Sequence, residues 1–276
     1  MSTQAEKANA LRALHHPGKP LVLVNVWDAF GARIIEDLGY PALATSSASV
    51  AWAHGYADGE RIPLADVLAM TEAIVRCVDI PVTADLEAGY GPTANDAAFA
   101  AQGAIAAGAV GMNFEDVNRA GEFFDRAAQV ARVAAVVETG ASSGVPIVLN
   151  ARTDAFLADI GPGDGWRLKE SIERGNAYLA AGADCIFVPG VDDEATIEKL
   201  VAGIRGKVSV LAGYGSPSIE RYAQLGVSRV SVGSASAGAT YAHFRSLASD
   251  IRDHRRFDEL GDRMSFREAN SLFTRR

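Results

Sequence analysis

The sequence predicts an α/β protein built as a single (β/α)8 barrel. Eight short apolar segments rich in β-branched residues alternate with longer segments of helical period, which is typical of a parallel sheet covered by helices. Eight strand–helix repeats exceed the roughly five or six strands usual in an open sheet. Glycines also stand between a helical segment and the next strand, where this fold needs a helix C-cap: Gly39, Gly108, Gly182 and Gly226.

The predicted strands share a short apolar composition bounded by turn or polar residues. They span Leu21–Asn25, Ala42–Ser46, Pro81–Asp85, Val110–Glu115, Pro146–Arg152, Asp184–Pro189, Lys207–Ala212 and Ser228–Gly233. The predicted helices have apolar residues at helical spacing. They span Asp28–Leu38, Pro63–Cys77, Asn95–Ala107, Asp125–Thr139, Gly165–Ala181, Asp193–Ile204, Pro217–Leu225 and Ala235–Ala248.

The length of 276 residues suits one barrel of about 250 residues, so we expect one domain over residues 1–276. The tail 252–276 is charged and helix-prone. We expect this extra C-terminal helix to cap the barrel, with packing on another subunit as the alternative. The tail's apolar residues are Leu260, Met264, Phe266, Leu272 and Phe273.

Composition and charge exclude several classes of partner. A net charge of −8 and a pI near 5.2 argue against nucleic acid and anionic membrane surfaces, which require basic clusters. Cys77 and Cys185 form neither a disulfide framework nor a cysteine metal motif. No segment approaches the roughly 18 consecutive apolar residues of a membrane span, and we expect a cytoplasmic protein that acts on a small molecule.

Acidic residues follow neighbouring strands at the end where parallel barrels carry their active sites. Asp85 and Glu87 are two residues apart, so on a strand they would point to the same side, and Glu115 ends the next strand. Three carboxylates held together repel one another unless a cation or a shared proton neutralises them. Oxygen ligands suit Mg²⁺, with Mn²⁺ as an alternative. Taken singly, each acid could instead be a solvated loop residue or a helix N-cap.

Arg152 ends the fifth predicted strand, where its planar fork could bind a substrate carboxylate. An internal salt bridge to Asp154 or Glu115 is the alternative, and both roles could coexist. Ser46, Ser47 and Ala48 open the expected loop after the second strand. Their hydroxyl and backbone N–H groups could bind a carboxylate or a developing oxyanion, although a plain serine-rich turn has the same spacing.

Several segments, in combination and in this order, resemble the isocitrate lyase/phosphoenolpyruvate mutase superfamily. The similarity runs from about Leu11 to about Phe244. It rests on Asn25–Ala29, Thr45–Ala48, Gly55–Asp58, Thr83–Gly91, Asn113–Asp116, Asn150–Asp154 and Gly182–Asp184.

The resemblance implies a TIM-type barrel, Mg²⁺ dependence and enolate chemistry on a pyruvate-type substrate. It implies that Asp85, Glu87 and Glu115 are metal-site acids, with Asp58 a further acid beside the metal-bound waters. It also implies a homo-oligomer, often a tetramer with exchanged C-terminal helices. The residues that it assigns to substrate binding are Trp27, Ser46, Ser47, Ala48, Asp85 and Arg152.

Two features depart from the superfamily pattern. Glu87 stands where an aspartate is usual. The segment after Glu115 lacks the Lys-Lys-Cys-Gly-His run of the isocitrate and methylisocitrate lyases and the Lys-Thr-Asn run of the phosphonomutases. It offers Asn118, Arg119 and Glu122 instead. The catalytic candidates are therefore Arg152 together with Asp58, Arg119 and Glu122, and the last three are the candidates for moving protons.

We expect a lyase that cleaves a C–C bond of a small 2-oxo or 2-hydroxy carboxylic acid through an enolate. One alternative is P–C chemistry, as a phosphonomutase or phosphonopyruvate hydrolase. Another is a pseudoenzyme that binds carboxylates without turnover. The substrate, the general acid, the oligomeric state and the choice between Mg²⁺ and Mn²⁺ do not follow from the sequence.

Overall fold

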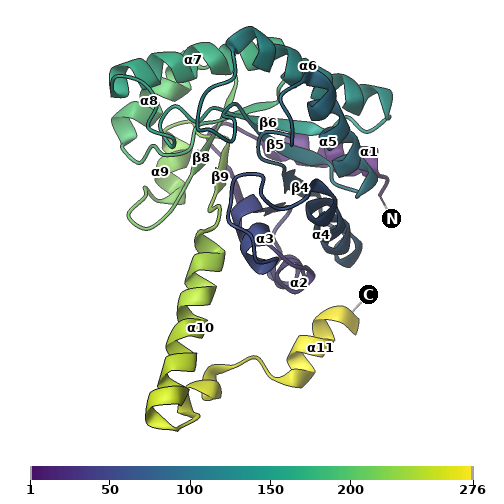
Figure 1. Ribbon diagram of the computed structural model, residues 1–276, viewed down its shortest axis with the longest axis vertical. Helices are drawn as coiled ribbons and strands as arrows, with labels where there is room; N and C mark the ends of the chain where they lie inside the picture. Colours follow the sequence, from purple (N-terminus) through teal and green to yellow (C-terminus); the bar gives the residue numbers. More distant parts are fainter. Residues whose placement is uncertain (1, 275–276) are drawn as a thin grey trace.

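A single sheet of nine parallel strands forms the predicted barrel in the computed structural model, which describes residues 2–274 (Figure 1). Its order is β1-β9-β8-β7-β6-β5-β4-β3-β2, with helices on the outside. The strands are β1 (Leu21–Leu23), β2 (Asn25–Val26), β3 (Leu43–Thr45), β4 (Val82–Asp85), β5 (Gly111–Glu115), β6 (Val148–Arg152), β7 (Cys185–Phe187), β8 (Lys207–Leu211) and β9 (Arg229–Ser231).

The sheet has nine strands rather than eight because the first predicted strand is broken at Val24. Its first half pairs with β9 and its second half with β3, so the two halves close the barrel. The buried Asn25 side chain bridges the seam. Its Nδ2 donates to Thr45 O at 2.8 Å, and its Oδ1 accepts the N–H groups of Val232 and Gly233 at 3.1 and 2.8 Å. These bonds replace ladder bonds that the break removes.

Eight helices follow the predicted pattern, and their ends fall within three residues of the prediction except at the end of α10. They are α2 (Ala29–Asp37), α4 (Leu64–Cys77), α5 (Ala94–Ala106), α6 (Arg126–Ser142), α7 (Asp164–Ala180), α8 (Glu194–Gly203), α9 (Ile219–Gln224) and α10 (Ala235–His254). Strand interiors are buried on both faces, as a sheet inside a shell of helices requires.

Two further helices were not predicted. α1 (Gln4–Leu14) begins with a capping box between Thr3 and Glu6 and buries Leu11, whose side chain lies against Gly111 at the start of β5. α3 (Ser47–Ala53) occupies the segment expected to be a loop, and Ser46 is its N-cap. The serines therefore begin a helix, which agrees with the preference of serine for N-cap positions.

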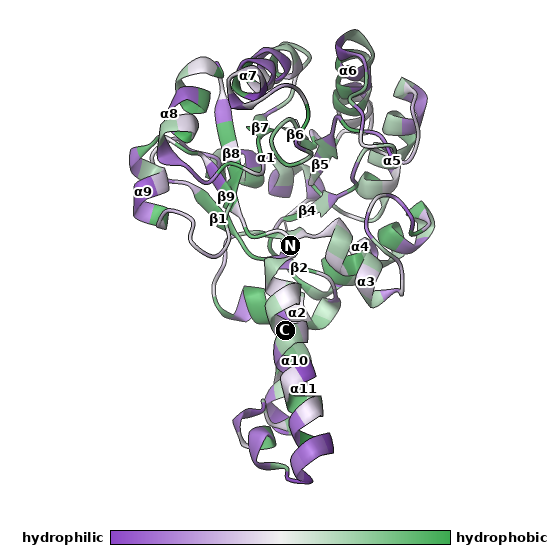
Figure 2. Cartoon of the chain, turned by 60° about the vertical axis from the view of Figure 1, so that its left-hand side comes forward, coloured by the Kyte–Doolittle hydropathy of each residue, from purple (hydrophilic) through white to green (hydrophobic). Residues whose placement is uncertain are grey.

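The prediction that the tail caps the barrel is wrong. α10 runs to His254, buries only Ala237 among its residues and projects away from the barrel (Figures 1 and 2). After a 3₁₀ turn at Asp258–Asp262, α11 (Phe266–Thr274) returns to α2. There Arg33 Nε donates to Leu272 O at 2.6 Å, and the rings of Phe30 and Phe273 stack with centroids 5.9 Å apart. The apolar face of α11 thus packs on α2 rather than across the barrel end.

The hydrophobic core fills the barrel and the layer between strands and helices. Its buried members include Leu23, Met112, Leu149 and Ile186 from the strands and Leu200 from α8. Across residues 2–274, none of the helices combines the length and apolarity needed to cross a membrane.

Candidate active site

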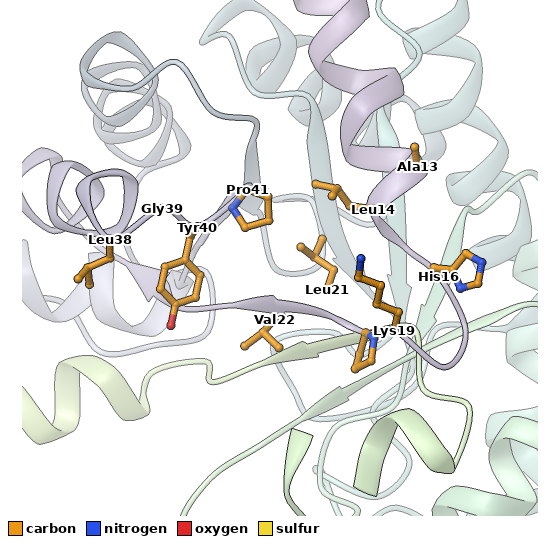
Figure 3. A pocket seen from close by; sticks show the side chains of 11 residues that line it. Ala13, Leu14, His16, Lys19, Leu21, Val22, Leu38, Gly39, Tyr40 and Pro41 are labelled. Atoms are coloured by element: carbon orange, nitrogen blue, oxygen red, sulfur yellow. The ribbon is translucent and has the colours of Figure 1, made fainter. Parts of the chain in front are cut away.

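A cavity of about 510 Å³ lies at the amino-terminal end of the strands and is not the candidate site (Figure 3). Leu14, Leu21 and Pro41 line it together with Lys19 and Tyr40. Barrel enzymes carry their chemistry at the opposite, carboxyl end of the strands. The predicted site residues lie at that opposite end.

The strand register brings the predicted acids together at the barrel mouth. Asp85, the last residue of β4, pairs with Asn113 in β5. Two residues further along β5, Glu115 pairs with Arg152 at the end of β6. Three adjacent strands therefore present Asp85, Glu115 and Arg152 at one edge.

Arg152 forms both of the ion pairs that the sequence left open. Its Nη1 lies 2.7 Å from Glu115 Oε2, and its Nε lies 2.7 Å from Asp154 Oδ1. Burial alone would lower the pKa of Arg152, but the charges of Asp154 and Glu115 outweigh burial and raise it. Burial raises the pKa of Glu115 although Arg152 opposes the shift. Two of the three guanidinium nitrogens, Nη1 and Nε, are thus paired with carboxylates of the chain. In the described part of the chain, only Nη2 is left without such a pair, so Arg152 does not offer a substrate carboxylate two unpaired nitrogens.

Asp85 forms hydrogen bonds with residues of β3 and α3, and one of its carboxylate oxygens has no hydrogen-bond donor within residues 2–274. Its Oδ2 accepts the Ser47 N–H at 3.0 Å, and its own N–H donates to Thr45 Oγ1 at 2.8 Å. Its Oδ1 is buried and accepts no hydrogen bond within residues 2–274. A buried carboxylate oxygen without a donor is costly, so the site favours a further positive group at this atom.

Glu87 does not share the strand geometry that its spacing predicts, because it lies beyond the end of β4 with a φ of 48°. Its side chain is buried, 3% exposed, and its Oε2 accepts the Glu60 N–H at 2.6 Å. Burial, and then the negative charges of Asp58 and Asp85, raise the pKa of Glu87 to about 7. Glu87 therefore reaches the acid cluster from the loop after β4.

Asp58 approaches the same cluster from the segment after α3. Asp58 is exposed as a residue, but desolvation of its carboxyl group, and then the charge of Asp85, raise its pKa, while a hydrogen bond from the Ser47 side chain opposes the shift. Ser47 thus contacts Asp85 through its backbone and Asp58 through its hydroxyl. Its N–H group is already occupied by a carboxylate of the chain.

The loop after β5 is a small hairpin, closed by a bridge between Val117 and Phe123. At its tip Arg119 Nε lies 3.1 Å from Glu60 Oε2, while the exposed Glu122 is bonded to Asn118 through its backbone. Within residues 2–274, neither side chain forms a hydrogen bond or ion pair with Asp85, Glu115 or Arg152. Trp27, the other predicted binding residue, packs on the core and against Tyr241 of α10, with ring centroids 5.9 Å apart.

Glu60 is a site residue that the sequence analysis missed, whereas Tyr90 lies in the Thr83–Gly91 segment that carries the family resemblance. Glu60 Oε1 accepts the Tyr90 N–H at 2.5 Å, and Tyr90 Oη donates to Glu87 Oε1 at 3.4 Å. A glutamate next to Gly59 and Arg61 resembles an ordinary exposed loop residue in the sequence. Its only sequence signal is its place two residues after Asp58.

The mouth has the chemistry of a site for a hard divalent cation. Its acids lie close enough to raise one another's pKa, and its ligand atoms are oxygens. One of these oxygens, Asp85 Oδ1, has no hydrogen-bond partner within residues 2–274. Within residues 2–274, however, no three or more histidine, cysteine, aspartate or glutamate side chains are arranged to hold a metal ion. The metal site of Asp85, Glu87 and Glu115 stays a prediction. Mg²⁺ commonly keeps several waters, so the residues fit a cation bound at Asp85, with the other acids acting through water.

Comparison with known proteins places this barrel in the phosphoenolpyruvate mutase/isocitrate lyase superfamily. A solved 2,3-dimethylmalate lyase of that superfamily is 25% identical, with a TM-score of 0.85 over 99% of this chain and 95% of that one. The family model for phosphoenolpyruvate phosphomutase matches residues 11–252, and the chain belongs to this family.

Two other relatives carry different functional names. A proposed phosphonomutase of known structure from Burkholderia cenocepacia J2315 is 41% identical, with a TM-score of 0.85 over 88% of this chain and 99% of that one. An oxaloacetate decarboxylase of Rhodopseudomonas palustris strain TIE-1 is 30% identical over 90% of this chain and 86% of the relative. The family is thereby established, whereas its members differ in reaction.

Replacing Arg152 tests whether it neutralises the buried acids. Arg152→Met leaves Glu115 and Asp154 without their cation, and we expect a loss of about 3 kcal/mol in the free energy of unfolding at pH 7.5. The unpaired acids then favour their protonated forms in the folded state, so this loss should shrink as the pH falls. Urea unfolding of Arg152→Met, Arg152→Lys and the exposed control Arg61→Met measures the effect. A loss in Arg152→Met no larger than that in Arg61→Met would contradict the assignment.

Proposed function

We propose that the protein is a Mg²⁺-dependent lyase that cleaves a C–C bond of a small 2-oxo or 2-hydroxy carboxylic acid through an enolate. The unpaired Asp85 Oδ1 within a cluster of coupled acids is the observation that carries the proposal. Mn²⁺ would fit the same oxygen donors. The similarity to an oxaloacetate decarboxylase and to a 2,3-dimethylmalate lyase supports the substrate class.

The cation would polarise the 2-oxo group and stabilise the negative charge that develops on it. Arg152 would orient the substrate carboxylate through Nη2, since Nε and Nη1 are held by Asp154 and Glu115. The fixed ion pairs keep the guanidinium in place without further loss of side-chain entropy. Ser46 to Ala48, at the start of α3, would line the same pocket, and Trp27 would shape its side beneath α10.

In this proposal Asp58 is the residue that moves the proton. With a 2-oxo acid that carries a carboxyl group on C3, cleavage of the C–C bond releases CO₂ and leaves the electron pair in the enolate. With a 2-hydroxy acid, Asp58 would take the hydroxyl proton, the C–O bond would become a carbonyl as the adjacent C–C bond breaks, and the electron pair would pass to the enolate of the other fragment. The enolate carbon then takes a proton. Asp58 has a raised pKa and lies within the influence of the Asp85 charge, whereas Arg119 is paired with Glu60 and the Glu122 backbone is bonded to Asn118 in the hairpin.

P–C chemistry is the second candidate, favoured by the similarity to the proposed phosphonomutase. A transferred phosphoryl group carries more negative charge than a carboxylate and needs positive groups around it. Both Arg152 and Arg119 are already paired with carboxylates of the chain. The charge at the mouth therefore favours the C–C reaction.

A turnover screen with Mg²⁺ decides between these reactions. The substrates are oxaloacetate, malate-type 2-hydroxy acids, methylisocitrate and phosphonopyruvate, and the products followed are pyruvate and phosphate. We expect pyruvate without phosphate, and activity at least about 100-fold lower in Asp85→Asn, because the proposed metal-binding carboxylate is lost. EDTA should have the same effect on the unmodified protein.

Release of phosphate from phosphonopyruvate, with no turnover of the oxo and hydroxy acids, would instead establish P–C chemistry. Binding of these compounds without any turnover would favour the carboxylate-binding pseudoenzyme. Either result contradicts the lyase proposal.

The proposal includes a homo-oligomer, a tetramer or dimer, in which C-terminal helices are exchanged. Large apolar side chains along the arm formed by α10 and α11 are solvent-exposed in the single chain, among them Phe244 at 64% and Phe266 at 87%. Burial of such a surface against another copy would stabilise the arm. With exchange, the contact between α11 and α2 would form between subunits. Light scattering that finds a monomer at micromolar concentration would contradict this part of the proposal.

A further inference from the structure

Glu60, Glu87 and Tyr90 form a closed ring of contacts at the edge of the barrel mouth. The Glu60 N–H donates to Glu87 Oε2 at 2.6 Å, and the Tyr90 N–H donates to Glu60 Oε1 at 2.5 Å. Tyr90 Oη completes the ring at Glu87 Oε1, 3.4 Å away. Each residue is thus held by the other two, so the position of the Glu87 carboxylate depends on both neighbouring loops.

All three residues adopt a left-handed backbone, with φ values of 55° at Glu60, 48° at Glu87 and 60° at Tyr90. This conformation costs energy in residues other than glycine and persists only where surrounding contacts enforce it. The ring supplies those contacts. Strain concentrated in one hydrogen-bonded group beside the acid cluster indicates that the geometry of Glu87 is imposed by its surroundings.

The Glu60 carboxylate also connects this ring to the hairpin after β5. Its Oε2 pairs with Arg119 Nε at 3.1 Å; the Glu60 side chain is 8% exposed and that of Arg119 is 62% exposed. Two cavities of about 420 and 450 Å³ are both lined by Glu60, Tyr90 and Arg119. The buried glutamate is therefore fixed, whereas the arginine is reached by solvent and can separate from it.

We propose that Glu60 is a positioning residue, which fixes the carboxylate of Glu87 for the metal site and holds the hairpin after β5 through Arg119. Only the metal part of this inference rests on the proposed function. The Glu60 side chain places Glu87 through Oε1, which holds Tyr90, and places the hairpin through Oε2; the backbone N–H bond to Glu87 is common to all Glu60 variants. The two roles use different atoms, so substitutions can separate them.

Glu60→Gly and Glu60→Gln provide the two variants. Glycine adopts the φ of 55° without strain, so Glu60→Gly removes the side chain while the fold can be kept. Glutamine keeps an oxygen that can accept the Tyr90 N–H but loses the charge that attracts Arg119. Glu72→Gln, at an exposed site on α4, is the matched control.

The first measurement is Mn²⁺ binding to the intact protein, followed by electron paramagnetic resonance without substrate. We expect Glu60→Gly to bind Mn²⁺ about tenfold more weakly or worse, as is typical when a residue behind a metal ligand is lost. Glu60→Gln and Glu72→Gln should remain close to the unmodified protein. A purely structural role would lower the melting temperature of Glu60→Gly without changing the Mn²⁺ affinity of the folded protein.

The second measurement is trypsin cleavage of the Arg119–Ala120 bond, quantified by mass spectrometry on the metal-free protein. Loss of the ion pair frees the hairpin tip, so both Glu60 variants should be cut up to about fivefold faster at this bond. Glu72→Gln should be cut at the original rate. This comparison requires neither metal nor activity.

The outcomes separate the two proposals. If the unmodified protein binds Mn²⁺ and Glu60→Gly binds it equally well, the positioning role of the Glu60 side chain at Glu87 is wrong. Unchanged cleavage at Arg119 in both variants would overturn the role at the hairpin. Failure of the unmodified protein to bind Mn²⁺ would contradict the proposed function and the metal part of this inference, while the cleavage rates still decide the role at the hairpin.

Discussion

Arg152 stands between Glu115 and Asp154 at the end of β6, and its two ion pairs offset only part of the negative charge at the barrel mouth. Asp85, Glu87 and Asp58 approach the same region from β4 and from two loops. Burial raises the pKa of Glu115 and Glu87, which shows how strongly this environment disfavours charge without a partner. A cation at the unpaired Asp85 oxygen would neutralise the excess. In the proposed function, substrate binding and proton transfer would both take place around that cation.

The scaffold explains how so many acids can be held together. Side-chain bonds from Asn25 close the barrel where the first strand breaks. Leu11 of α1 packs beside the first residue of β5, so the strand that carries Glu115 is supported from its amino-terminal end. The stability of this packed barrel offsets the cost of burying charge at its mouth. The exposed arm of α10 and α11 contributes little to the mouth within a single chain.

Much of this arrangement could be predicted from sequence because the buried strands are apolar segments that end where polar residues begin. The barrel, its strand–helix units and the positions of Asp85, Glu115 and Arg152 follow from that rule. Glu87 was misplaced because its left-handed backbone breaks the two-residue alternation. Glu60 was missed because its burial results from contacts with Tyr90 and Arg119, which are distant in sequence. The tail was misplaced for the same reason, since α11 packs on α2.

The account depends most directly on a cation at Asp85. A crystal grown with Mn²⁺ and measured at the manganese absorption edge would locate the ion by its anomalous scattering. The account predicts one Mn²⁺ about 2.2 Å from Asp85 Oδ1, with water molecules between the ion and Glu87 and Glu115. A fully occupied Mn²⁺ site elsewhere on the protein, with none at Asp85, would contradict this account. So would a barrel mouth that holds no ion in a crystal grown with millimolar Mn²⁺.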